Sequence, residues 1–207
     1  GLAPGLRQVQ VSQPETATLE TWAESSSSKS ALETWAESAS GRSTLKTWVE
    51  SASSKAAKLG DRRSVILTFS NHDYLPTLAN WMAGLRKLGV DNYEVICMDK
   101  RMVDFMKSIG RPCLSHRNVQ RTPQIWEFRL KMLAKLLDKG VDVVLSDADA
   151  FWLRDPAALL TEGGDIVASR GKFPFNVADQ LGAAACMGWI SFRGTPSVAR
   201  FLRKEVM

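Results

Sequence analysis

The stretch VDVVLSDADAFWLRDP, residues 141 to 156, decides how the rest of the chain is arranged. Residues 141 to 145 form a short, mainly apolar run, which is typical of a strand buried on both faces of a parallel sheet. Two carboxylates, Asp147 and Asp149, follow at once and are separated only by the small residue Ala148. Because open α/β sheets bind ligands at the carboxyl ends of their strands, we expect both carboxylates to project into a ligand-binding crevice.

The close pair of carboxylates calls for a positive charge between them, since two like charges in a crevice disfavour each other. A divalent Mg²⁺ or Mn²⁺ ion that carries substrate phosphates would supply this charge. The plain alternative is that the pair caps the segment that follows. Asp155 and Pro156, however, already supply an N-cap and a first helical residue ahead of residues 157 to 160. A lone Asp-x-Asp is common, so spacing alone leaves both interpretations open.

The wider segment resembles the Asp-x-Asp segment of the nucleotide-diphospho-sugar transferase family. These are GT-A type glycosyltransferases, among them plant cell-wall xylosyl- and arabinosyltransferases, in which Asp-x-Asp precedes an aromatic residue, Trp-Leu, a basic or polar residue and Pro. The matching residues are Asp147, Asp149, Phe151, Trp152, Leu153, Arg154 and Pro156. The resemblance extends from about Arg63 to the end of the chain.

The resemblance implies a nucleotide-sugar site at residues 147 to 149. Asp149 would coordinate a divalent cation, Mn²⁺ or Mg²⁺, that bridges both phosphates of the donor, and Asp147 would hold the ribose or a metal-bound water. A fixed cation stabilises the charge that develops on a departing diphosphate. The expected activity is hexosyl or pentosyl transfer from a nucleotide-diphosphate donor to a glycan or protein acceptor. The sequence names neither the sugar, the base, the acceptor nor the stereochemical outcome.

Four further residues are candidates for the site. The polar loop that follows the first predicted strand offers Asn71 and Asp73 as contacts to the base or ribose. Arg129 and Lys131 lie two residues apart on a predicted helix and cannot share one face, so at most one would reach a phosphate. A solvated helix face is the favoured interpretation for both.

Two departures from the family pattern concern the later part of the chain. The later strand has Cys186 and Met187 before Gly188 where the family often has Asn or a similar polar residue. Many GT-A enzymes also take a metal ligand, often His, from well downstream of the Asp pair, and the two histidines here, His72 and His116, both precede it. We therefore expect the nucleotide-binding part of a C-terminally truncated enzyme.

From Arg63 onward, short apolar runs alternate with segments of helical periodicity. The expected strands are 65–69, 95–98, 141–145, 165–168 and 183–192, and the expected helices are 78–88, 102–109, 125–136 and 196–206. This order, with short links, predicts an α/β, Rossmann-like GT-A fold with a mostly parallel sheet. The chain has neither G-x-G-x-x-G after the first strand nor a P-loop, so dinucleotide and P-loop classes lack their phosphate cradles.

Residues 1 to 60 differ from the rest. A 13-residue unit begins at Thr18, Ala31 and Thr44 and each time contains a Leu-x-x-Trp followed by a Ser-rich break. Successive Trp residues would be about 220° apart on a continuous helix, so short helical turns are expected instead. We predict a low-complexity stem over 1–60, outside a folded domain over 61–207. An array of Trp side chains that binds a partner or stacks on sugars is the alternative.

Composition limits the other classes of function. The net charge is +5, and Lys and Arg form no run, so nucleic acid is not an expected partner. Nothing is long and apolar enough to span a membrane, and no signal peptide is visible. The chain begins with Gly and is expected to be a fragment or processed product, with a Golgi-lumen location implied by the resemblance and the cytoplasm as alternative. Cys97, Cys113 and Cys186 show no metal spacing, and Cys97 is expected to be a buried thiol.

Two competing functions remain. A phosphatase of the haloacid dehalogenase type also has Asp-x-Asp after a strand, but it expects Thr or Val where this chain has Phe151. The other alternative is a non-catalytic or degenerate protein. Its domain would bind nucleotide sugars without turnover, or its Trp-rich stem would bind partners.

Overall fold

The computed structural model describes residues 39–59, 62–115, 122–156, 160 and 163–206. Their elements are α3 (Ala39–Lys55), β1 (Ala57–Leu59), β2 (Arg62–Ser70), the 3-10 turn η1 (His72–Tyr74), α4 (Leu75–Lys87), β3 (Tyr93–Cys97), α5 (Lys100–Ser108), β4 (Leu114–Ser115), α6 (Thr122–Leu137), β5 (Asp142–Ser146), β6 (Ile166–Gly171), α8 (Phe175–Leu181), β7 (Ala184–Phe192), α9 (Pro196–Phe201) and the π-helical turn η2 (Leu202–Val206). His116 lies outside the described residues. So do residues 157–159, and the helix predicted over 157–160 is therefore not described either.

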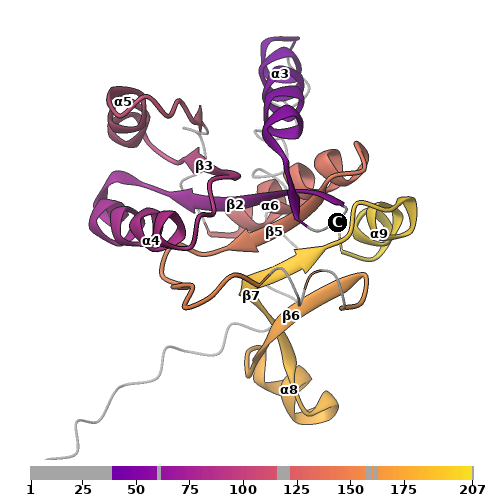
Figure 1. The fold of residues 1–207 in the computed structure, drawn as a ribbon. Helices are drawn as coiled ribbons and strands as arrows, with labels where there is room; N and C mark the ends of the chain where they lie inside the picture. The colour runs from indigo at the N-terminus through magenta and orange to yellow at the C-terminus, as the bar shows by residue number, and fades with distance from the viewer. Residues whose placement is uncertain (1–38, 60–61, 116–121, 157–159, 161–162, 207) are drawn as a thin grey trace, which may run out of the picture.

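In the described part of the chain one mixed sheet carries the fold (Figure 1). Its strand order is β4-β3-β2-β5-β7-β6, with β1 beside the start of β2. The four strands β4, β3, β2 and β5 run parallel, whereas β7, β6 and β1 join antiparallel. The predicted α/β class with a parallel core is confirmed, and the strands predicted around residues 65, 95, 141, 165 and 183 all form.

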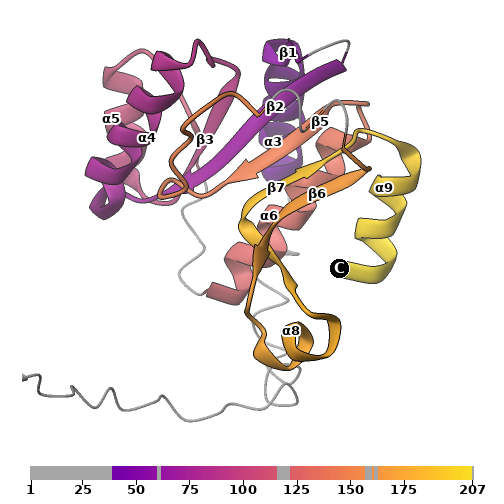
Figure 2. The same cartoon turned by 60° about the horizontal axis from the view of Figure 1, so that its bottom comes forward.

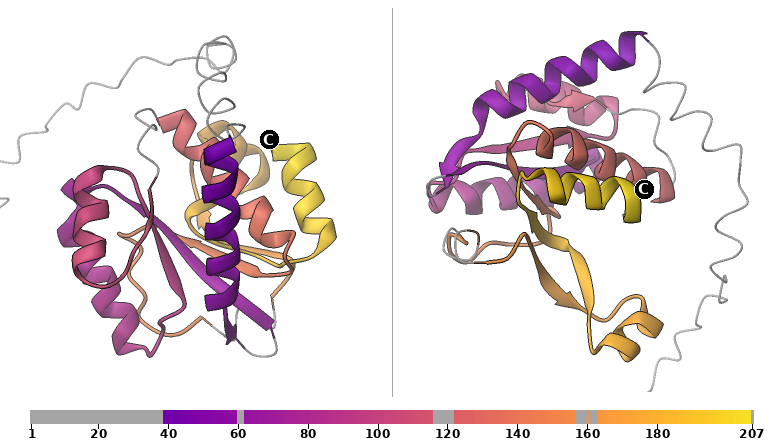
Figure 3. Two further views of the ribbon diagram at one scale, coloured as in Figure 1. Left: turned by 90° about the horizontal axis from the view of Figure 1, so that it is seen from above. Right: turned by 90° about the vertical axis from the view of Figure 1, so that its right-hand side faces the viewer.

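Helices cover the two faces of the sheet, and the alternation of side chains along the strands decides which face each residue joins. Val65 and Leu67 of β2 pack in a core with residues of α3, α6 and α9, whereas Ile66 packs with residues of α4 and α5. Successive side chains of a strand point to opposite faces, so both faces of β2 are buried. The result is a three-layer arrangement, which the two views of Figure 3 display.

Helix α3 corrects the predicted domain boundary. Trp48, Val49 and Ala52 lie at helical spacing and are at most 8% exposed in the core shared with α6. At the end of the helix, Lys55 Nζ lies 2.8 Å from a carboxylate oxygen of the buried Glu94. The expectation that residues 1–60 lie outside the folded domain is therefore wrong for residues 39–59. The prediction assumed that the Trp residues of all three repeats would have to share one helix face in order to pack. The apolar residues of α3 alone are enough to dock this helix on the core.

The cysteines correct a second expectation. Cys97, at the end of β3, forms a disulfide with Cys113, which directly precedes β4. Strand β4 pairs in parallel with the end of β3, and this brings the two cysteines to a Cα separation of 5.9 Å. Cys97 is thus buried as predicted but is not a thiol, and Cys186 is the free cysteine among the described residues. The two-residue strand β4 carries too little pattern to be predicted from sequence.

The strands β6 and β7 extend beyond the sheet as a hairpin that carries α8 at its tip. Figures 1 and 2 both show this arm projecting from the body of the domain. Helix α8, which sequence periodicity did not predict, has Ala178 as its buried residue. No helix within the described ranges is both long and apolar enough to cross a membrane.

Candidate functional site

The Asp pair lies where the sequence placed it, at the carboxyl end of the buried strand β5. The amide of Asp147 donates to the Gly188 carbonyl of β7 at 2.9 Å, and the Asp147 carbonyl accepts from the amide of Ala150 at 3.0 Å. This turn buries Ala148, which is 4% exposed, and leaves Asp149 exposed. Ala148 packs in the core with residues of α4 and α5, and a filled core favours a small side chain at this position.

A pocket of about 540 Å³ opens beside the pair. Its walls are the ends of β2 and β3, the loop after β2, the first half of α6 and the Asp pair itself. It is lined by Phe69, Ser70, Asn71, Tyr74, Met98, Ile125, Trp126, Arg129, Asp147, Ala148 and Asp149. Its volume lies in the range of pockets that bind small molecules and cofactors, about 300 to 1,000 Å³.

Arg129 is the site residue that sequence reasoning placed wrongly. It is 9% exposed, and its Nη1 lies 3.0 Å from Oδ1 of Asp147. The guanidinium carbon lies 4.7 Å from the ring centre of Phe69 and 4.8 Å from that of Trp126, so the cation is held between two aromatic rings. The expected solvated helix face is therefore wrong for Arg129, whose partners come from β2 and from the loop after β5. Lys131, two residues further on, is not among the residues that line the pocket.

The electrostatics of this pair are set by burial. Burial lowers the pKa of Arg129, and the charges of Asp147 and then Asp149 act in the opposite direction. Arginine stays protonated in proteins, so the pocket contains a fixed cation next to two carboxylates. The buried Nε of Arg129 has no hydrogen-bond partner among the described residues, whereas Oδ1 of Asp147 is held in the ion pair with Nη1. A cation that lines a pocket is suited to an anionic group such as a phosphate.

The loop after β2 brings one of its two predicted contacts to the pocket. Asn71 lines the pocket, and its Oδ1 also accepts from the amide of Tyr74 at 3.2 Å, which caps the turn η1. Asp73 is not among the lining residues. Its side chain is 83% exposed, and its Oδ1 lies 3.9 Å from Nη1 of Arg101. The structure therefore brings Asn71 together with the Asp pair and leaves Asp73 at the surface.

Asp99 fixes this loop against the sheet, and sequence reasoning missed it. Its carboxylate accepts from the amide of His72 and from that of Met102, both at 2.7 Å. Burial raises the pKa of Asp99, but the two backbone hydrogen bonds outweigh it, so the pKa lies below its usual value. The available sequence signal was an Asp at the N-cap of α5. That signal does not reveal the second bond, because an N-cap Asp has the same local sequence whether or not it also bonds a neighbouring loop.

The donor set fits a cation that takes most of its ligands from substrate. The described residues contain no group of three or more His, Cys, Asp or Glu that could hold a metal ion. Asp147 and Asp149 offer hard carboxylate oxygens, and one oxygen of Asp147 already faces Arg129. Mg²⁺ and Mn²⁺ bound through one or two carboxylates and substrate phosphates match such a set.

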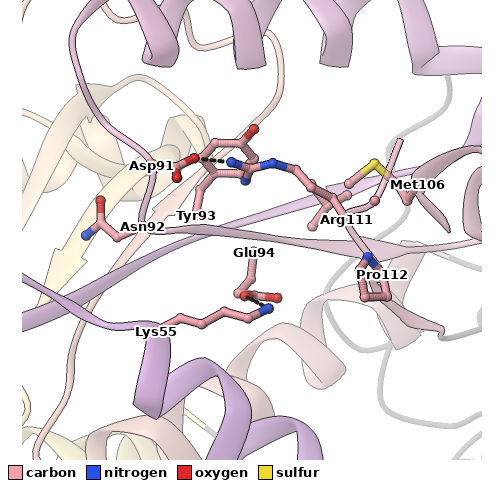
Figure 4. Close-up of a pocket in the computed structure, with 10 residues that line it drawn as sticks. Lys55, Asp91, Asn92, Tyr93, Glu94, Met106, Arg111 and Pro112 are labelled. Atoms are coloured by element: carbon pink, nitrogen blue, oxygen red, sulfur yellow. Dashed lines mark hydrogen bonds and ion pairs between the residues drawn. The ribbon is translucent and has the colours of Figure 1, made fainter. Parts of the chain in front are cut away.

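A second pocket, of about 590 Å³, lies at the amino end of β3, opposite to the end at which the Asp pair lies (Figure 4). Its charged side chains neutralise one another: Lys55 pairs with Glu94, and Arg111 pairs with Asp91. Arg111 also covers the ring of Tyr93, with 4.4 Å between the guanidinium carbon and the ring centre. Ligands of open α/β sheets bind at the carboxyl ends of strands, so the pocket at the Asp pair is the candidate site.

The fold and the pocket together define a class of protein: an α/β domain with an acidic pair and a buried arginine in one pocket at the carboxyl ends of parallel strands. The chain belongs to the nucleotide-diphospho-sugar transferase family, whose model matches residues 88–207. The family expected from the Asp-x-Asp segment is thus confirmed, and the haloacid dehalogenase alternative is set aside.

Curated relatives come from Arabidopsis thaliana. The chain is 26% identical over 127 residues to "Beta-arabinofuranosyltransferase RAY1", a match that covers 55% of this chain and 24% of that protein. It is 24% identical over 160 residues to "Arabinosyltransferase XEG113", covering 68% of this chain and 25% of the relative. The chain therefore spans about a quarter of the length of these two relatives.

Solved structures with a similar backbone include two glycosyltransferases. The apo structure of the bifunctional glycosyltransferase WbbM matches with a TM-score of 0.45 and 13% identity, over 71% of this chain and 35% of that one. The apo form of GlyE from Streptococcus pneumoniae TIGR4 matches with a TM-score of 0.42 and 10% identity, over 69% and 36% of the two chains.

Proposed function

We propose that this chain is the nucleotide-sugar-binding part of a glycosyltransferase, which transfers a sugar from a nucleotide-diphosphate donor to a glycan or protein acceptor. The observation that carries the proposal is the meeting of Asp147, Asp149 and the buried Arg129 in one pocket, in a chain that belongs to the nucleotide-diphospho-sugar transferase family. Both relatives are arabinosyltransferases by name, which supports a pentosyl, specifically arabinosyl, donor.

Each residue has a distinct task in this proposal. Arg129 holds the Asp147 carboxylate and would place its positive charge beside the phosphates of the donor. Asn71, on the loop that Asp99 fixes, is placed for the base or ribose. Asp149 would hold Mn²⁺ or Mg²⁺, with Asp147 beside it, and the cation would neutralise the departing diphosphate.

The disulfide supports a compartment for this activity. Disulfides form and persist in the secretory pathway and outside the cell, and they are rare in the cytosol. We infer from the Cys97–Cys113 bond that the domain works in an oxidising compartment and not in the cytoplasm, and the Golgi lumen implied by the family resemblance is a compartment of this secretory route. Non-reducing peptide mapping that recovered free thiols at both positions from the native protein would remove this support.

Calorimetry of UDP binding with Mn²⁺ tests the metal and nucleotide site. Asp149 is exposed, so Asp149→Asn removes charge without leaving a buried gap and should leave the fold intact. We expect Mn²⁺-dependent UDP affinity to fall by roughly a factor of ten or more, equivalent to the loss of about 1.4 kcal/mol. Asp179→Asn, an equally charged change on the exposed arm helix α8, is the matched control and should bind like the wild type. Equal affinity in all three proteins, or binding that needs no metal, would return the Asp pair to a structural role.

A further inference from the structure

The loop that starts with the Asp pair lines a second pocket directly after the first. Residues 147 to 149 line the candidate donor pocket, and the next seven residues, Ala150 to Pro156, line a pocket of about 460 Å³ together with Trp189 of β7. Consecutive Cα atoms are 3.8 Å apart, so the Cα of Phe151 lies at most about 7.6 Å from that of Asp149. The two pockets are therefore neighbours along one short segment.

The side chains of this segment divide between the core and solvent. Trp152 points inward: its indole Nε1 donates to Ser146 Oγ at 3.1 Å, and its ring meets the ring of Trp189 edge-on with 6.4 Å between centres. Phe151 and Leu153, on either side of it, are 50% and 93% exposed. The inward Trp anchors the segment, and the two side chains beside it face solvent at the pocket.

Exposed apolar side chains gathered in a pocket indicate a binding surface. Here the apolar floor of Phe151, Leu153 and Trp189 is joined by the exposed Arg154, whose guanidinium offers several hydrogen-bond donors. Aromatic rings that face the C–H surface of a sugar, with a polar donor at the rim for its hydroxyl groups, form a surface suited to a saccharide.

We propose that Phe151, Leu153 and Trp189, with Arg154 at the rim, form the platform that binds the acceptor, and that this acceptor is a saccharide chain. The inference rests on the proposed function, because a sugar transferase needs its acceptor next to the donor sugar. The platform meets this need, since it begins two residues after Asp149, whereas the donor pocket lies on the other side of the Asp pair, over β2, β3 and α6. Its volume is within the range of about 300 to 1,000 Å³ that accommodates small ligands.

The test follows the methyl resonances of Leu153 in the full chain loaded with Mn²⁺ and UDP. The probes are xylotetraose, arabinotetraose and cellotetraose, all neutral. We expect at least one of them to shift the Leu153 signals saturably, and we expect Phe151→Ala to weaken that saccharide roughly tenfold. Phe201→Ala is the matched control, because Phe201 is 46% exposed at the end of α9, a helix that packs on the opposite face of the sheet.

The readouts separate this inference from the proposed function. Binding of UDP with Mn²⁺ is measured in the same samples, and we expect Phe151→Ala to leave that affinity within about twofold. Intact UDP binding with no Leu153 response to any of the three saccharides would overturn the acceptor platform and leave the donor site standing. A Leu153 shift that depends on protein concentration alone would identify a self-association surface and overturn the platform as well. Failure of the wild type to bind any nucleoside diphosphate with Mn²⁺, UDP and GDP included, would instead overturn the proposed function, and the platform with it.

Discussion

Replacement of Arg129 by Met is the perturbation with the most direct structural consequence. Met keeps much of the side-chain volume but removes the cation that faces Asp147 and the contacts with Phe69 and Trp126. Breaking a fully buried ion pair costs about 3 to 5 kcal/mol. The Asp147 side chain is 34% exposed, so water recovers part of that loss. Each cation–π contact adds about 0.5 to 1 kcal/mol. We expect the free energy of unfolding to fall by about 2 to 4 kcal/mol.

The pairing itself is isolated by a double-mutant cycle in urea unfolding, monitored by near-UV circular dichroism. Asp147→Asn removes the partner charge, and if the two side chains interact as the 3.0 Å separation indicates, the double variant is more stable than the sum of the single changes predicts. The expected coupling is about 1 to 3 kcal/mol. Arg129→Lys keeps the charge but loses the planar fork and the stacking, so it should lie between wild type and Arg129→Met. A coupling energy below about 0.5 kcal/mol would refute the pairing.

Two further predictions concern stability away from the Asp pair. Asp99→Asn keeps an oxygen acceptor but removes the charge. The pKa of Asp99 is lowered in the folded state. The contribution of the Asp99 charge to the free energy of unfolding is therefore present above the unfolded pKa of about 3.9 and is lost as the pH falls through the folded pKa. Urea unfolding should show a deficit at pH 7 that shrinks as the pH falls below the unfolded pKa of about 3.9, and a deficit independent of pH would contradict the assignment. Trp48→Ala should destabilise the domain by about 3 kcal/mol, whereas the exposed Thr47→Ala should have little effect. Equal midpoints in thermal unfolding would show that α3 is not part of the folded domain.

The elements that sequence analysis predicted are those whose pattern is local. Buried strands such as β5 are continuous apolar runs, and the Asp pair could be placed because it directly follows such a run. Helix α6 and helix α4 have apolar residues at helical spacing and end near glycines with positive φ, Gly140 and Gly89. The position of the pocket followed from the same local signals.

The features that were missed depend on contacts between segments distant in sequence. Arg129 was judged on its own helix, where it is a polar residue two positions from Lys131, but its burial comes from Phe69, some sixty residues earlier, and from Asp147. The disulfide likewise depends on how β4 pairs with β3, which two residues of strand do not encode locally. Helix α3 shows the reverse problem, since repetition of its sequence drew attention to the repeat and away from the single apolar stripe that packs.

The two carboxylates of the pair are not equivalent, and this difference bears on how the site is charged. Asp147 faces a buried arginine at 3.0 Å, whereas Asp149 is exposed beyond the turn. The chain's own cation therefore balances one of the two charges before any ligand arrives, and the repulsion that first suggested a metal between them is already reduced. A divalent ion would then depend mainly on Asp149 and on the phosphates it carries. It follows that loss of the Asp147 charge should appear first in stability, through Arg129, and loss of the Asp149 charge first in metal-dependent nucleotide binding.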